Sequence, residues 1–97
     1  MDKDAFRAEL LSEGYEVKEG ELPANEHNEM HTHAFDARSL VLGGSITLVF
    51  ADGSRHTYNP GDTFFVAAGV PQEEFIGADG FQYLAGLRQP AEAHAAE

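Results

Sequence analysis

The sequence predicts an all-β domain of short antiparallel strands, preceded by one short helix. Apolar and polar residues alternate over short segments, and turn-forming pairs such as Asp52-Gly53 recur at close intervals. Helical spacing of apolar residues is confined to residues 1–14. The 97 residues correspond to one domain, and 42% of them are hydrophobic, which is enough to form a core.

The composition limits the classes of partner. Six basic residues face seventeen acidic ones, giving a net charge of −11. Such a chain is repelled by nucleic acid and by anionic membrane surfaces, so neither is an expected partner. The absence of cysteine excludes disulfides and thiolate metal sites. The N-terminus lacks the apolar stretch of a signal peptide, so we expect a cytoplasmic protein. Its small size favours a homodimer.

The first element is a predicted helix over residues 4–13. Phe6, Leu10 and Leu11 are spaced so that they share one helical face. Asp2 or Asp4 can cap its start, and Gly14 suits the position just after its end.

After Gly14 the pattern changes to short strands separated by turns, which form a barrel over residues 15–88. Glycine pairs and proline, as at 43–44 and 59–62, predict turns between strands. Residues 89–97 are small and polar and are expected to form a flexible tail. The predicted strands, part of a total of seven to nine, include 15–17, 28–33, 39–42, 46–50, 55–58, 63–66, 74–76 and 81–87.

His31 and His33 are the first candidate functional residues. On a strand they point to the same face, ~6.6 Å apart at ~3.3 Å per residue. Two imidazoles on one face can converge on one transition-metal ion. With five histidines in the chain such a pair also arises by chance, so the pair alone is weak evidence.

The surrounding sequence resembles the cupin superfamily. His31, His33, the apolar run 40–42 and Gly44 follow the order of its first motif. Residues 59–71, with the turn Pro60-Gly61-Asp62 followed by an apolar strand, follow its second motif. The resemblance covers about residues 21–86. It implies a small single-domain cupin, with a double-stranded β-helix (a jelly-roll barrel) after a short N-terminal helix.

The ligand set implied by this resemblance is altered at two positions. Ala37 stands where the family has a glutamate, and Gln72 stands where it has a histidine. The predicted metal site therefore consists of His31, His33, Asp36 and Gln72, and its cofactor is a divalent transition metal such as Fe, Mn, Ni, Zn or Cu. Asp36 is one residue early, so only a bulge or turn would direct it toward the histidines.

Other residues near this site have alternative roles. Glu29 is a second candidate for the missing carboxylate, whereas His27 is more simply an exposed residue, as is His56 beside a hairpin turn. Arg38 is predicted to form a salt bridge, with a substrate carboxylate as the alternative partner. Most aromatic residues are expected in the core, and one or two of them in a pocket. This set consists of Phe35, Phe64, Phe65, Phe75, Phe81 and Tyr83.

Three functions are consistent with these features. The first is a metal-dependent enzyme, such as a dioxygenase or isomerase, that acts on a small molecule. The second is a non-catalytic cupin that binds or senses a small molecule and has lost the metal, as the changes at Ala37 and Gln72 favour. The third is a structural module that dimerises through its sheets.

Overall fold

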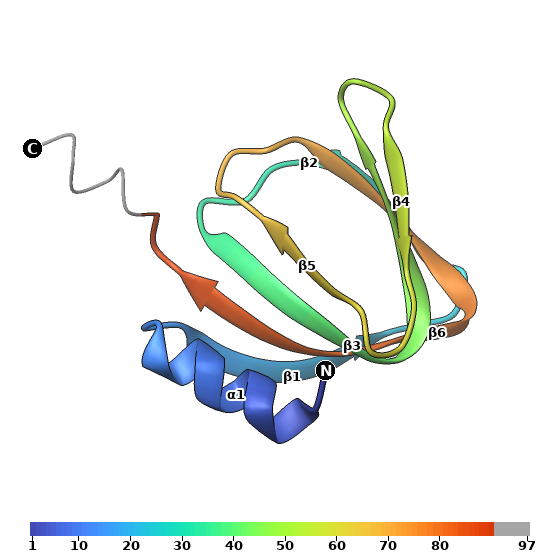
Figure 1. Cartoon of the computed structure of the whole chain (residues 1–97). Coiled ribbons are helices and arrows are strands. Elements are labelled where there is room, and N and C mark those ends of the chain that lie inside the picture. The colour runs from blue at the N-terminus through green and yellow to red at the C-terminus, as the bar shows by residue number, and fades with distance from the viewer. Residues whose placement is uncertain (91–97) are drawn as a thin grey trace, which may run out of the picture.

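The computed structural model describes residues 1–90, so most of the tail predicted at 89–97 lies outside the described residues. This part of the chain contains one helix and six strands (Figure 1). This helix is not long and apolar enough to cross a membrane. The elements are α1 (Lys3–Ser12), β1 (Glu16–Leu22), β2 (His27–His31), β3 (Asp36–Phe50), β4 (Arg55–Tyr58), β5 (Thr63–Val66) and β6 (Gln72–Arg88).

The N-terminal helix is confirmed, with bounds one residue earlier than predicted. The Asp2 carboxylate caps it by accepting hydrogen bonds from the backbone N–H groups of Asp4 and Ala5. Phe6 and Leu10 are fully buried on its inner face. Gly14 follows with a φ of +84°, a left-handed conformation in which glycine carries no steric penalty.

Two long strands, β3 and β6, organise the sheet. They pair antiparallel along nearly their whole length, from Asp36 opposite Arg88 to Phe50 opposite Gln72. One half of this pair is flanked by β1 and β5, and the other half by β2 and β4. Figure 1 shows the sheet folded over so that its two halves face each other. Its strand order is β1-β6-β3-β4, with β2 and β5 attached to β6 and β3, so the described strands form no closed ring.

The glycine pair at 43–44 does not form the predicted turn, and Gly77 and Gly80 do not interrupt β6. All four lie inside strands, which explains why six strands replace the seven to nine predicted. The β3–β6 register shifts on both sides of this point. Gly44 has a φ of +70°, and a Cβ placed there would lie 1.8 Å from the carbonyl oxygen of Gly80. These glycines therefore let both strands bend together through a bulge, because no side chain separates their backbones.

The turns on either side of β4 are confirmed. Asp52-Gly53 closes the β3–β4 hairpin, with Gly53 at a φ of +89°. Hydrogen bonds donated by the Ser54 hydroxyl and, second, by its backbone N–H lower the pKa of Asp52. The segment 59–62 then separates β4 from β5, as predicted.

The molecule has two apolar clusters on opposite faces of the sheet. One lies between the helix and the sheet, where Phe6 and Leu10 pack against Leu40 and Leu84. The other lies between the two halves of the sheet. Its buried members are Val41, Ile46, Leu48, Val66, Ile76 and Phe81.

Candidate functional site

The space between the two halves of the sheet contains a cavity of about 180 Å³. Its existence follows from small side chains on the inner face of the sheet. Ala37 and Ser39 on β3 and Ala85 on β6 line it, and Ser39 is the cross-strand partner of Ala85. Because these residues are small, the inner face leaves room that larger side chains would fill.

Aromatic rings form much of the cavity wall. Phe35, Phe64, Phe81 and Tyr83 all line it. Phe81 lies 6.3 Å from Phe64 and 5.1 Å from Tyr83 between ring centroids. Ring pairs at such centroid distances attract each other beyond the effect of burial alone. The cavity therefore has an apolar, aromatic wall with a small number of polar groups.

His33 and Gln72 form the first polar group of the cavity. The Nδ1–H of His33 donates to the carbonyl oxygen of Phe35 at 2.7 Å. Its Nε2 lies 2.9 Å from the amide nitrogen of Gln72, which is 2% exposed. Because a carbonyl only accepts, Nδ1 carries the hydrogen, and Nε2 accepts from the Gln72 amide. These two contacts therefore fix the orientation of the imidazole ring.

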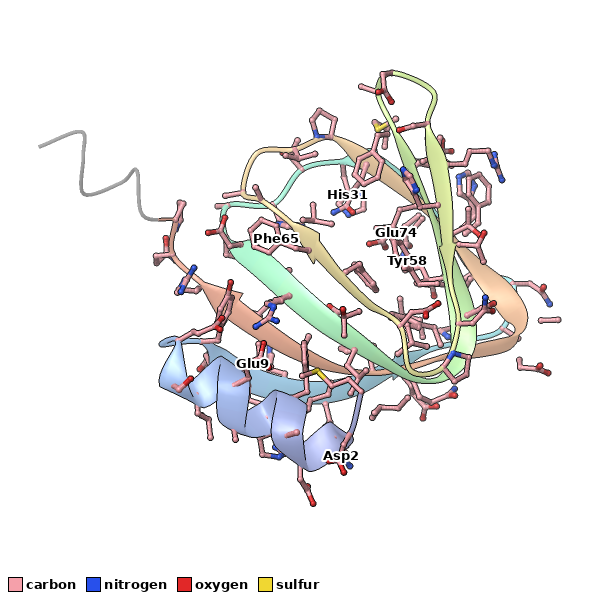
Figure 2. All side chains as sticks on the ribbon, viewed as in Figure 1. Asp2, Glu9, His31, Tyr58, Phe65 and Glu74 are labelled. Atoms are coloured by element: carbon pink, nitrogen blue, oxygen red, sulfur yellow. The ribbon has the colours of Figure 1, made fainter. Side chains whose placement is uncertain are left out.

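His31 is the register partner of Gln72 across the β2–β6 pair, but it does not line the cavity. Its side chain is exposed, and its Nδ1–H donates to the carbonyl oxygen of Glu29 at 2.7 Å. Figure 2 shows His31 toward the rim, with Glu74 deeper in the space between the halves of the sheet. The structure therefore brings His31, His33 and Gln72 to the same end of the cavity.

Asp36 lies on the opposite face of β3. Ala37 lines the cavity, so its neighbour Asp36 points the other way, as alternation along a strand requires. The Asp36 carboxylate accepts a hydrogen bond at 2.9 Å from the backbone N–H of Ala68, and Asp36 is 8% exposed. No bulge redirects it, because the register of β3 is regular until Val41. Asp36 therefore anchors the loop after β5.

The residues present do not fit the predicted four-ligand metal site. With Asp36 directed away, two imidazoles and one neutral amide remain, without the carboxylate that the predicted set requires. Over residues 1–90 no group of three or more His, Cys, Asp or Glu side chains is placed to hold an ion. The Nδ1 hydrogen bonds orient both imidazoles as in metal ligands, and they leave Nε2 of His31 for ligation, whereas Nε2 of His33 accepts from the Gln72 amide.

The alternative ligands Glu29 and His27 lie outside the cavity. Glu29 is exposed, and so is His27, as predicted. His27 lies 2.6 Å from a Glu73 oxygen and stacks on Phe75 at 4.4 Å on the outer face of the sheet. His56 is exposed, which confirms its predicted surface position.

Glu74 is the cavity residue that sequence reasoning missed. It lies two residues after Gln72 on β6, so both side chains face inward. Oε1 of Glu74 accepts a hydrogen bond from the Asn28 amide at 2.9 Å. Its spacing from Gln72 was the signal available in the sequence.

Arg38 forms the predicted salt bridge and does not face the cavity. Its guanidinium pairs with Glu9 and, at 3.0 Å, with Glu13, joining β3 to the helix. The hydrogen bond to Glu9 is the main cause that raises the pKa of Arg38 above its usual value. The same guanidinium lies 5.2 Å from the centre of the Phe6 ring.

Two aromatic residues depart from their predicted place in the core. Phe65 is 52% exposed, because it alternates with the inward-facing Phe64 on β5. Phe75 lies on the outer face of the sheet, where the Arg55 guanidinium covers its ring at 5.7 Å. The cavity is lined by four aromatic residues, where one or two were expected.

Solved structures with the same architecture are known. A cupin-2 domain-containing protein from Shewanella frigidimarina aligns with a TM-score of 0.62 at 18% identity, over 78% of this chain and 71% of that one. The polyketide cyclase RemF from Streptomyces resistomycificus aligns with a TM-score of 0.63 at 25% identity, over 77% and 59%. The DMSP lyase DddQ from Ruegeria pomeroyi aligns with a TM-score of 0.66 at 21% identity, over 78% of this chain and 39% of that one.

No protein-family model matches the chain, and no curated protein matches its sequence. The chain spans about two fifths of the length of the DMSP lyase that it resembles. At these identities the similarity concerns the fold. The chain has the cupin fold, as the two sequence motifs predict.

Proposed function

We propose that this protein binds a small organic molecule in the cavity between the two halves of its jelly-roll sheet, without a metal ion. The observation that carries the proposal is the cavity itself. It has about 180 Å³ of space, aromatic walls, and polar groups gathered around Gln72. An apolar cavity of ~150 Å³ is enough to hold benzene, so this one accommodates a ring or a branched chain of similar size.

Titration with phenol tests the proposal. Phenol matches the apolar wall with its ring and the polar groups with its hydroxyl. We expect it to shift the amide resonances of cavity residues in ¹⁵N–¹H NMR spectra, with saturation. Ala85→Leu, which places a larger side chain in the cavity, should weaken binding by about tenfold or more. Ala51→Leu is the matched control, because Ala51 is exposed at the β3–β4 hairpin. Equal binding by both variants would place phenol elsewhere and overturn the proposal.

Metal-dependent catalysis is the second candidate function. It is favoured by the Nδ1 hydrogen bonds of His31 and His33, which are usual for imidazoles that ligate a metal through Nε2. A divalent transition metal would replace the hydrogen bond between Gln72 and Nε2 of His33, and would use these two imidazoles and, after rotation of its amide, the Gln72 oxygen. Metal analysis of protein purified without an affinity tag tests this function. A stoichiometric metal that is lost in the His31→Ala, His33→Ala double variant would favour it over the metal-free proposal.

The homodimer and the cytoplasmic location remain predictions. Sedimentation analysis of the purified protein checks the first, since a dimer has twice the 10.5 kDa mass of the chain. Fractionation of the cells that produce the protein checks the second.

A further inference from the structure

Glu74 is a carboxylate in a mainly apolar cavity. Oε1 of Glu74 accepts a hydrogen bond from Asn28 at 2.9 Å. Over residues 1–90, no side chain or backbone group donates a hydrogen bond to Oε2 of Glu74. Asn28 also donates to Glu26 at 3.1 Å, so a second carboxylate lies behind the amide that orients the first. One oxygen of Glu74 is therefore left for a ligand.

No basic side chain neutralises this carboxylate. All six Lys and Arg residues of the chain lie within residues 1–90, and none of them lines the cavity. Arg38 pairs with acidic residues of the helix, and Arg55 covers Phe75 on the outer face. The two ring nitrogens of His33 contact Phe35 and Gln72, and not Glu74. Over residues 1–90, no basic side chain thus forms an ion pair with Glu74.

The aromatic wall, like the Glu74 carboxylate, favours a positively charged ligand. The face of a benzene or phenol ring carries partial negative charge and attracts a cation within about 6 Å. Phe35, Phe64, Phe81 and Tyr83 line the same cavity as Glu74. Aromatic rings with a nearby carboxylate are the usual way in which proteins bind ammonium groups that carry methyl substituents. An anionic ligand would be repelled by the Glu74 carboxylate and by the negative faces of the rings.

We infer that the cavity ligand is a small organic cation with an apolar surface, such as a quaternary or protonated amine, held by Glu74 and the aromatic wall. This inference rests on the proposed small-molecule binding and names its ligand class. The net charge of −11 supports it, because the field of the whole molecule attracts cations.

Two probes of equal shape separate charge from fit. Choline is a cation, and 3,3-dimethyl-1-butanol is its neutral counterpart with carbon in place of nitrogen. Both are titrated by NMR at physiological ionic strength, where long-range attraction is screened. We expect choline to bind at least about tenfold more tightly than the alcohol. Equal or tighter binding of the alcohol would overturn the inference while leaving small-molecule binding intact. If neither probe shifts cavity resonances, the inference is overturned, and the phenol titration then decides whether small-molecule binding itself stands.

Glu74→Gln locates the preference at one side chain. The substitution keeps the shape and the hydrogen bond from Asn28 but removes the charge. We expect it to weaken choline binding by about tenfold and to change binding of the alcohol by less than about twofold. Glu73→Gln is the matched control, since Glu73 is the sequence neighbour but pairs with His27 on the outer face. An equal loss of choline affinity in both variants would assign the effect to net charge and overturn the inference.

Discussion

The two faces of β3 and β6 differ in how completely they are packed. On the face toward the helix, Leu40 and Leu84 are at most 1% exposed and contact Phe6 and Leu10, which are fully buried. On the other face, small residues leave a cavity of about 180 Å³ in the middle of the apolar side chains. One pair of strands therefore supports a filled core on one side and a binding cavity on the other.

This difference indicates that one face mainly provides stability and the other mainly binds a ligand. A filled core contributes stability in proportion to the apolar area it buries, whereas a cavity forgoes contacts that larger side chains would make. Arg38 and its acidic partners Glu9 and Glu13 also fasten the helix to the filled face. We expect changes on the helix face to alter stability, and changes on the cavity face to alter ligand affinity.

Truncation of Phe6 should have the largest effect on stability. Phe6→Ala leaves a void in a fully buried cluster and also removes the ring under the Arg38 guanidinium. We expect the free energy of unfolding to fall by about 3–5 kcal/mol, as measured by urea denaturation. Leu11→Ala is the matched control on the same helix, because Leu11 is 59% exposed, and it should change stability by less than about 0.5 kcal/mol. Equal losses in the two variants would show that the helix face is not the filled core described here.

Filling the cavity should have a smaller and opposite effect. Ser39→Val places two methyl groups where the cavity has room, so the free energy of unfolding should rise by about 1 kcal/mol while phenol binding weakens. Ser39→Ala removes the hydroxyl without filling the space, and it should leave phenol binding in place. A loss of stability in Ser39→Val comparable to that of Phe6→Ala would indicate that both faces are equally filled.

The smallest effect concerns the exposed ion pairs between the helix and β1. Lys3 and Arg7 donate to the Glu19 carboxylate at 2.8 and 2.9 Å and lower its pKa. A lowered pKa in the folded state stabilises the protein above the unfolded-state value near 4.5, and this stabilisation is lost as the pH falls through the folded-state pKa.

Glu19→Gln should therefore reduce the loss of melting temperature between about pH 5 and about pH 3, measured by circular dichroism. Added salt should weaken the difference, because the three groups are exposed. If Glu19→Gln leaves the loss of melting temperature at low pH unchanged, these ion pairs do not help to hold the helix on the sheet.

Much of the fold was predictable from local sequence. The helix at residues 3–12 and the strands at 55–58 and 63–66 follow from apolar periodicity and turn residues, which act over a few positions. The turn predicted at the glycine pair 43–44 was wrong because glycine occurs both in tight turns and in bulges. Which of the two forms depends on the strand opposite. Here Gly80 on β6 comes so close that Gly44 has no room for a side chain.

The candidate site was predictable only in part. Local pattern and the cupin resemblance identified His33 and Gln72, which the structure joins by a hydrogen bond. Alternation along the strand indicated that Asp36 faces away unless a bulge or turn redirects it, and the sequence did not decide between these two; Glu74 was not identified. The inward direction of Glu74 depends on the pairing of β6 with β2 and β3, in which Asn28 and Leu48 are its neighbours.

By itself, the sequence determined the one helix, the predominance of β-strands, the acidic charge and the absence of thiolate chemistry. These are properties of composition and of short-range periodicity. Only the tertiary structure decided which face of β3 is filled and which is hollow, and which carboxylate enters the hollow. The physical reason is that either face of an unpaired strand can turn toward the core. Pairing with strands distant in sequence sets the register, and the register decides whether each side chain faces the core, the cavity or solvent.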